Sequence, residues 1–324
     1  MIPAGTPGKG PRAASGPGAI GPRTSPGPGT GTSTVPAAPQ HTERAEGLYL
    51  DAWRRLRRNR LAMAGLVVII VLMLVAVSAP YIAPYDPYKQ SLDDQLKPPS
   101  REYPLGTDDL GRDIASRIIY GSRISLSVGF VAEAISLAIG VTLGAISGYF
   151  GGGVDNVIMR ITDMMFAFPD LLFAIAIMFA LGPGIYNVFI ALGIVGWAGM
   201  ARLVRGQVLA VRGREFVEAA KAVGESDLRI IAKHVLPNCL APIIVSVTLG
   251  IPGAIMAEAG LSFLGLGAQP PTPSWGQMIS IGKGYLRFAP WFSVYPGLAI
   301  MITVLAFNLF GDGLRDALDP RLRE

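Results

Sequence analysis

The segment Leu61–Ala79 reads LAMAGLVVIIVLMLVAVSA, nineteen residues without a charged side chain. At about 1.5 Å per residue, a helix of this length reaches roughly 28 Å, which matches the hydrocarbon thickness of a bilayer. Five arginines lie between Arg54 and Arg60, directly before it. Because basic residues flank the cytoplasmic ends of membrane helices, this segment is predicted to be a membrane span that starts in the cytoplasm.

The composition of the whole chain agrees with a membrane protein. Of its 324 residues, 51% are hydrophobic and 16% are charged, whereas soluble domains carry about 25% charged residues. The net charge of +5 does not indicate nucleic-acid binding, because the basic residues cluster beside apolar segments, as they do in loops on an anionic lipid face. One cysteine, Cys239, and two histidines are too few for an internal disulfide or a zinc site.

Five further apolar segments follow the first. Backbone amides in lipid need partners within their own segment, so each is expected to be a helix. The predicted fold class is all-α, a bundle of six transmembrane helices with both termini in the cytoplasm. The orientation rests on sixteen basic residues in the predicted cytoplasmic segments from residue 48 onward, against eight in the external ones. The further spans are expected near Ile124–Tyr149, Ile161–Leu181, Ile185–Met200, Leu236–Met256 and Trp291–Phe310.

The chain divides into five predicted parts. Residues 1–40 contain nine prolines and nine glycines, so residues 1–47 are predicted to be a disordered cytoplasmic tail. No apolar core of a signal peptide occurs there. The other parts are a basic lead-in with the first span (48–80), an extracytoplasmic segment (81–123), the core with five spans (124–310) and a cytoplasmic C-terminal tail (311–324).

The extracytoplasmic segment is expected to contain an amphipathic helix on the outer membrane face. Leu110, Ile114 and Ile118 recur at a spacing of four residues, and Thr107 or Asp108 is suited to cap the helix. Two roles remain open for this helix: contact with another protein, or a brace at the interface.

Between the fourth and fifth spans, residues 215–233 predict a short helix pair in the cytoplasm. Phe216, Val217, Ala220 and Val223 share one helical face, Gly224 interrupts the helix, and Pro237 opens the next span. Small side chains at the tip would allow it to enter a groove on a partner. The alternative is an ordinary amphipathic helix that lies on lipid.

This loop carries a motif. Glu-Ala-Ala, three residues, Gly and, after a fixed gap, Leu-Pro resembles the pattern of permease subunits of ABC importers, here at Glu218, Ala219, Ala220, Gly224, Leu236 and Pro237. His234 departs from the usual isoleucine, as in the peptide-permease branch; we interpret it as a helix-terminal polar residue rather than a proton carrier. PLGTDDLGRD (104–113), EAGLSFLGLG (258–267) and GDGLRDALDPR (311–321) resemble the dipeptide/oligopeptide C-type subunit.

The resemblance implies a set of partners and roles. A homologous B-type permease subunit would complete the path, two cytosolic ABC ATPases would bind ATP and Mg, and an extracytoplasmic binding protein would deliver substrate. This sequence has no G-x-x-x-x-G-K-[ST] phosphate loop and no catalytic or metal-ligand grouping. It is therefore expected to be a transport subunit without an enzyme activity or cofactor of its own. The implied ATPase-coupling residues are Glu215, Glu218, Ala219, Ala220, Gly224, His234, Leu236 and Pro237.

Two further groups of residues are candidates for the substrate path. Glu133 and Asp170 fall within predicted spans, where two roles remain open: they line the path and meet a substrate's amino group, or they hydrogen-bond to neighbouring helices or the partner subunit. The glycines and prolines of residues 258–276 are expected to rule out a long regular helix there. The resemblance implies a loop near the outer gate, and a tight re-entrant turn is the alternative. The candidate outer-gate residues are Glu258, Ser262, Phe263, Leu264 and Trp275. Asp163 lies one turn from Arg160, so these two are expected to form an ion pair.

The sequence leaves the substrate open. Dipeptides or longer peptides are the first interpretation, and importers of the same fold also carry nickel or small oligosaccharides. A membrane scaffold or a passive channel without ATP coupling is a further alternative of another class.

Overall fold

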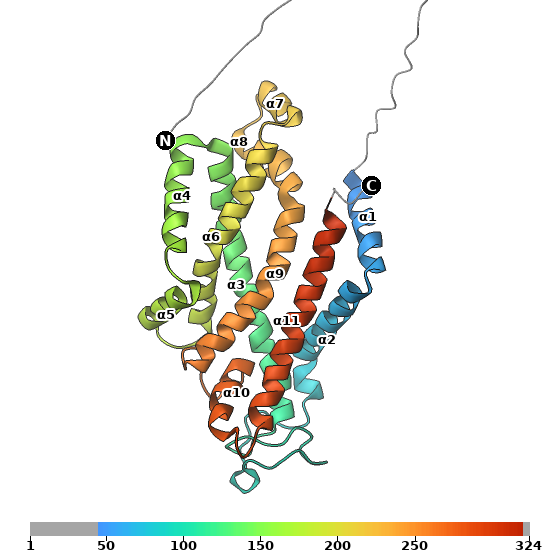
Figure 1. Ribbon diagram of the computed structural model, residues 1–324, viewed down its shortest axis with the longest axis vertical. Coiled ribbons are helices and arrows are strands. Elements are labelled where there is room, and N and C mark those ends of the chain that lie inside the picture. Colours follow the sequence, from blue (N-terminus) through green and yellow to red (C-terminus); the bar gives the residue numbers. More distant parts are fainter. Residues whose placement is uncertain (1–44, 320–324) are drawn as a thin grey trace, which may run out of the picture. The chain divides into compact units, whose positions relative to one another are not determined.

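The computed structural model describes residues 45–319, with side chains from Asp51 onward, and it is helical apart from turns and loops (Figure 1). The predicted disordered tail lies outside the described residues up to residue 44, and residues 45–47 belong to the first helix. The α-helices are α1 (Ala45–Arg58), α2 (Arg60–Ile82), α3 (Ile114–Phe150), α4 (Gly152–Phe166), α5 (Asp170–Leu181), α6 (Ile185–Val211), α7 (Glu215–Ala222), α8 (Asp227–Ile230), α9 (Leu236–Phe263), α10 (Trp275–Gly282) and α11 (Trp291–Leu318).

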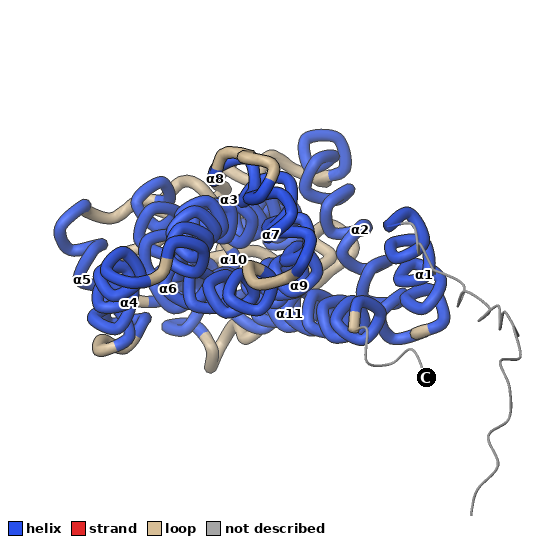
Figure 2. The backbone as a smooth tube through the Cα atoms, turned by 90° about the horizontal axis from the view of Figure 1, so that it is seen from above, coloured by secondary structure: helices blue, strands red, loops and turns tan. Residues whose placement is uncertain are grey.

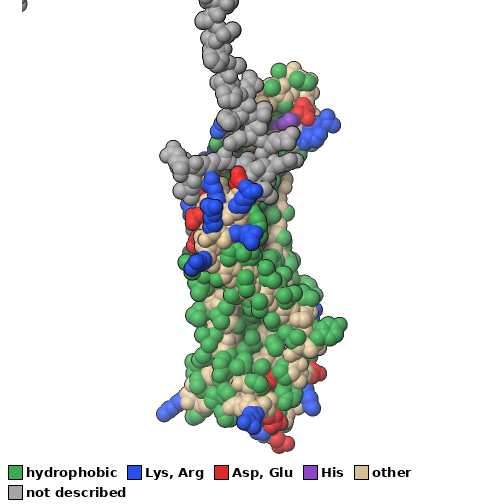
Figure 3. Space-filling model, turned by 90° about the vertical axis from the view of Figure 1, so that its right-hand side faces the viewer, with side chains coloured by type: hydrophobic (Ala, Val, Ile, Leu, Met, Phe, Trp, Pro, Cys, Tyr) green, Lys and Arg blue, Asp and Glu red, His purple; other side chains and the backbone are tan. Residues whose placement is uncertain are grey.

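The described helices confirm the predicted membrane bundle. Five helical segments are long and apolar enough to span a bilayer: α2, α3, α6, the run Asp227–Phe263 and α11. The pair α4 and α5 would supply a sixth span. Figure 3 shows one face of the molecule, where hydrophobic side chains cover the middle and charged side chains gather toward the two ends. This is the distribution that a bilayer requires, because charged groups stay in water.

The third predicted span is not one straight helix. The sequence favoured a continuous helix from Ile161 to Leu181, but α4 ends at Phe166 and α5 starts at Asp170, bent by 92°. Pro169 stands directly before α5. Proline lacks the N–H that a continuing helix needs and disfavours the helical conformation of the residue before it, which explains the break.

Helices α3 and α6 approach each other along a row of glycines. Gly140, Gly144 and Gly148 are buried at intervals of four residues on α3. A Cβ atom at Gly144 would lie 2.5 Å from the carbonyl oxygen of Ala201 on α6, and one at Gly148 would lie 2.9 Å from that of Arg205. Small residues at such spacing let membrane helices pack backbone against backbone. On the other side of the bundle, α11 packs against both α9 and α2 (Figure 2).

We expect Gly144→Val to destabilise the purified chain by about 1 to 3 kcal/mol, because the added carbons must push α3 and α6 apart. Thermal unfolding in detergent measures the loss. Gly206→Val on α6 is the control, since a Cβ there would meet no atom within 4 Å. Equal unfolding temperatures for the two variants would contradict the close helix contact.

Residues 81–123 differ from their prediction. Residues 107–113 form turns rather than an amphipathic helix, and α3 starts at Ile114 with Asp113 as its cap, not Thr107 or Asp108. The reason is local: the Asp108 carboxylate accepts hydrogen bonds from the N–H groups of Leu110 and Arg112, both at 2.9 Å, which closes a turn. Ile114 is fully buried against Met278 and Phe292 instead of facing lipid.

The same segment holds a second polar cluster around Asp94. Its carboxylate pairs with Lys97 and accepts hydrogen bonds from the Ser91 hydroxyl at 2.7 Å and the Tyr103 hydroxyl at 2.9 Å. Lys97, then the two hydroxyls, lower the pKa of Asp94 to about 2. The carboxylate therefore stays ionised throughout the neutral range and holds this loop folded.

Candidate functional site

The helix pair predicted over residues 215–233 is present. Helix α7 is followed by Gly224, whose φ of +84° lies in the region that favours glycine. Helix α8 comes next, then one π-helical turn over Ile231–Val235, and α9 starts with Pro237 in its first turn. In Figure 1, α7 stands at the end of the bundle opposite α10. Residues 215–233 therefore form a compact projection, which we call the α7–α8 knob.

The knob is attached to the bundle by a small number of buried contacts. Val217 of α7 and Ile230 of α8 are fully buried, in one cluster with Val208 of α6. The Tyr149 hydroxyl at the end of α3 donates a hydrogen bond to Asp227 at 2.8 Å. Sequence reasoning missed Tyr149, because nothing local links it to a loop 78 residues later. These contacts make the knob continuous with α3, α6 and α9.

The apolar face predicted for α7 is split by the structure. Val217 is buried and Ala220 is half-buried, but Phe216 is 43% exposed and Val223 is 89% exposed. Leu228 of α8 is also 77% exposed. The predicted face is therefore not covered as a whole, since the helix buries Val217 against the bundle and leaves Phe216 and Val223 exposed. An exposed apolar patch of this kind is suited to a protein partner.

The other predicted coupling residues lie on or beside the knob. Glu215 and Ala219 are exposed on α7, and Glu218 pairs with Lys221 at 2.9 Å. His234 is half-buried, with its Nε2 atom 2.7 Å from Glu225 Oε2. Leu236 and Pro237 open α9, half-buried and exposed respectively. The structure therefore brings all eight predicted positions to one end of the bundle.

The predicted outer-gate residues lie at the other end, partly in helix. Glu258, Ser262 and Phe263 belong to the end of α9, and the irregular stretch runs from Leu264 to Ser274, so no long regular helix crosses residues 258–276, as predicted. The Ser262 hydroxyl donates to Glu258 Oε1 at 2.6 Å, one helical turn away, and Leu261 is fully buried. These contacts hold the last turn of α9 despite its glycines.

Most of these outer residues are enclosed by protein. Glu258 is fully buried and also accepts a hydrogen bond from Ser274 at 3.0 Å. Trp275, 1% exposed, starts α10 and donates from Nε1 to the carbonyl oxygen of Ile118 at 3.0 Å. Phe263 and Leu264, 43% and 56% exposed, are the two whose side chains are open at the surface. The corner between α9 and α10 is thus locked to the start of α3.

The two intramembrane acids lie in different places. Glu133 is half-buried on α3, and a Cβ atom at Gly250 of α9 would lie 2.5 Å from its Oε2 atom. Its carboxylate therefore rests on the glycine backbone of α9. Asp170 is exposed at the start of α5, beside α6. The structure does not gather the two acids into one site.

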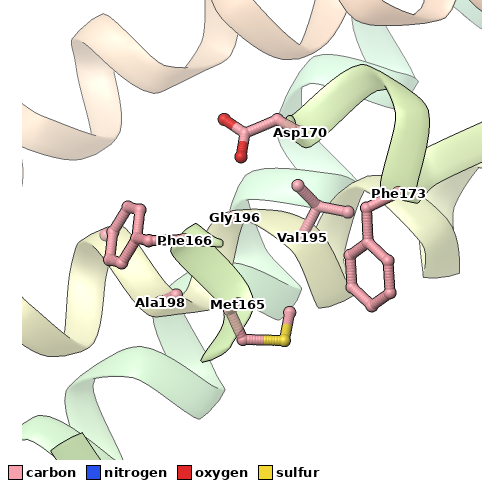
Figure 4. A pocket seen from close by; sticks show the side chains of 8 residues that line it. Met165, Phe166, Asp170, Phe173, Val195, Gly196 and Ala198 are labelled. Carbon is pink, nitrogen blue, oxygen red and sulfur yellow. The ribbon is translucent and has the colours of Figure 1, made fainter. Parts of the chain in front are cut away.

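Asp170 borders a cavity of about 100 Å³ at the α4–α5 corner (Figure 4). Its walls come from Met165 and Phe166 of α4, Phe173 of α5 and the α6 stretch around Val195 and Gly196. Asp163 lies nearby on α4 but pairs with Arg202 of α6 at 2.7 Å, not with Arg160 as the sequence suggested. The Arg202 guanidinium also lies 4.1 Å from the centre of the Phe166 ring.

No group of three or more His, Cys, Asp or Glu side chains is placed to hold a metal ion within residues 45–319.

The family follows from comparison with known proteins. Residues 140–324 match the model of the binding-protein-dependent transport system inner membrane component, which is more than half of the chain. The chain belongs to this family. Residues 47–99 of this permease also match the N-terminal TM domain of oligopeptide transport permease C.

Relatives cover nearly the full permease. It is 47% identical to the dipeptide transport system permease protein DppC of Alkalihalophilus pseudofirmus, over 90% of this chain and 95% of the relative. It is 45% identical to the oligopeptide transport system permease protein OppC of Bacillus subtilis, over 87% and 93% of the two chains. A glutathione transport system permease protein, GsiD of Escherichia coli, is 48% identical over 84% and 90%.

A solved structure supports the fold. The MetNI methionine ABC transporter, in an inward-facing form, superposes with a TM-score of 0.53 over 63% of this permease and 96% of that chain, at 18% identity. The arrangement of helices is therefore that of ABC importer permeases.

Proposed function

We propose that this permease forms, with a homologous second permease subunit, the membrane path of an ATP-driven importer of di- and oligopeptides. Two cytosolic ATPases would bind ATP and Mg, and an extracytoplasmic binding protein would deliver the peptide. The observation that carries the proposal is the α7–α8 knob, with its exposed Phe216, Val223 and Leu228 and its buried attachment to α3, α6 and α9. Close relatives named for dipeptide and oligopeptide transport support the substrate class.

The orientation we propose places the knob and both termini in the cytoplasm. In Figure 1, α1 and the end of α11 lie at the same end of the bundle as α7. Helix α1 and the residue that starts α2 carry five arginines between Arg54 and Arg60. Basic residues of this kind stay on the cytoplasmic side, where they also meet anionic lipid.

In the proposed mechanism the ATPases close on ATP and move the knob, and the buried contacts carry that movement into the bundle. The path then opens outward, and hydrolysis returns it to the inward-facing state. ATP shifts this equilibrium only as far as its affinity differs between the two states.

The test is a pair of substitutions in the knob. Glu218→Ala removes the partner of Lys221, and Gly224→Val forces a branched residue into a left-handed backbone at a cost of about 1 to 3 kcal/mol. We expect Gly224→Val to lower ATPase co-purification and peptide uptake about tenfold, with a smaller loss for Glu218→Ala. Membrane insertion should be unchanged.

Gly284→Val is the matched control, because Gly284 lies outside the knob and a Cβ there would meet no atom within 4 Å. Normal uptake by both knob variants would contradict ATPase coupling through this loop and favour a passive channel or scaffold. A panel of peptides, nickel and oligosaccharides in thermal-shift assays of the cognate binding protein separates the substrate classes.

A further inference from the structure

The cavity at the α4–α5 corner combines one acidic group with apolar walls. Met165, Phe166, Phe173 and Val195 line it together with Asp170, and Figure 4 shows the Asp170 carboxylate above the Phe166 and Met165 side chains. Ligand sites in proteins have this composition: apolar walls with a few placed polar groups. A cavity of about 100 Å³ accepts a small chemical group rather than a whole substrate.

Asp170 is an acidic residue within an apolar segment. Helices α4 and α5 together are long and apolar enough to span a membrane, and Asp170 lies at the bend between them. Carboxylates inside membrane-spanning segments face a water-filled path or a partner group. Asp170 is exposed, and no hydrogen bond or ion pair from another described side chain reaches it. It is the first residue of α5.

The Asp170 carboxylate favours a cation as ligand of the cavity. The rings of Phe166 and Phe173 supply apolar wall rather than free cation-binding faces, because the Arg202 guanidinium already lies over the Phe166 ring and Phe173 stacks on Phe168. Gly199 contributes to the wall on α6, where nothing lies within 4 Å of its Cβ position, so this side is open. In Figure 1, α5 lies closer to α10 than to α7. A substrate that enters from the end of the bundle opposite the knob would meet this corner before it reached the knob.

We propose that this cavity is a subsite of the transport path that binds the amino-terminal ammonium group of a peptide through the Asp170 carboxylate. The inference rests on the proposed peptide-importer function and specifies its chemistry. An oligosaccharide has no cation for the carboxylate to bind. A nickel ion would need several nitrogen, oxygen or sulfur ligands. Among the described residues, Asp170 is the one carboxylate that lines this cavity, and no histidine or cysteine does.

The experiment compares two radiolabelled tripeptides with the same side chains, one with a free amino terminus and one N-acetylated. Uptake is measured in proteoliposomes that contain the complete transporter, with the binding protein and ATP. Asp170→Asn keeps the shape of the side chain and removes its charge. Asp93→Asn, at an exposed external position, is the matched control. Because the binding protein is the same throughout, a change in the free-to-acetylated uptake ratio reports the permease.

We expect Asp170→Asn to lower uptake of the free peptide about tenfold, the loss of one charge-assisted hydrogen bond, and to leave uptake of the acetylated peptide unchanged. The ratio should be restored by Asp170→Glu and unaffected by Asp93→Asn. An equal loss for both peptides, or an unaltered ratio in an Asp170→Asn complex that assembles and hydrolyses ATP, would overturn the subsite. Absence of ATP-dependent peptide uptake by the wild-type complex would instead contradict the proposed function itself.

Discussion

Asp108→Asn is expected to destabilise residues 81–123 by roughly 3 to 5 kcal/mol, because it removes the carboxylate shared by two buried guanidinium groups. Arg117 then has no ion-pair partner among the described residues, and Arg112 keeps only Asp109, at 3.6 Å. Asp108 is fully buried, and its Oδ2 atom lies 2.7 Å from Arg112 Nε and 3.3 Å from Arg117 Nε. The two arginine side chains are 4% and 1% exposed. Water cannot solvate them when the carboxylate loses its charge.

The loss of stability should extend from these three side chains to the loop after α2. Arg117, in the first turns of α3, donates from Nη1 to the carbonyl oxygen of Pro87 at 3.1 Å, so it ties the loop after α2 to α3. Limited proteolysis of the purified chain should therefore cleave residues 83–113 at lower protease concentration, and the unfolding temperature should fall. Asp93→Asn, at an exposed position of the same segment, is expected to behave as wild type. Equal protease resistance of the two variants would show that the buried charges carry no net stability.

Elements whose structure is set by residues close to each other in the sequence could be predicted. The apolar run after Arg60 became α2, and the glycine and proline around residues 215–237 marked the breaks of the α7–α8 knob. In both cases the deciding interactions lie within a few residues of each other. The pattern of hydrophobicity and the breakers therefore carried enough information for the span and the knob.

Features that depend on contacts between separate segments of the chain could not be predicted. The ion pair of Asp163 joins it to Arg202, 39 residues later, although Arg160 stands one turn away. The start of α3 depends on two interactions of Asp108. Its carboxylate accepts a hydrogen bond from the N–H group of Arg112, and it pairs with the buried Arg117. The cavity beside Asp170 needs the 92° bend that Pro169 allows and the neighbouring face of α6. Periodicity identifies a helical face, but it does not identify the element that covers the face.

Two neighbouring residues of α7 are expected to have different functions: the buried Val217 anchors the knob to the bundle, and the exposed Phe216 meets the ATPase. Val217→Asp is expected to lower ATP-driven peptide uptake about a hundredfold. Val217 is fully buried between α7 and the bundle, and an unpaired carboxylate at such a position costs roughly 3 kcal/mol, which corresponds to more than a hundredfold in population. The anchored knob would become a minor state, and protease should cleave residues 212–235 of the purified chain readily.

Docking and transmission can then be measured apart. Phe216, adjacent to Val217 but 43% exposed, belongs to the surface proposed to meet the ATPase. Phe216→Ser should weaken ATPase co-purification and leave protease resistance unchanged. Val217→Ala keeps the exposed surface and loosens the anchor, so it should retain ATPase binding and transport fewer peptides for each ATP hydrolysed. If Val217→Ala and Val217→Asp both transported with wild-type stoichiometry, movement of the knob would not be what opens the path, and the buried cluster around Val208 and Ile230 would serve stability alone.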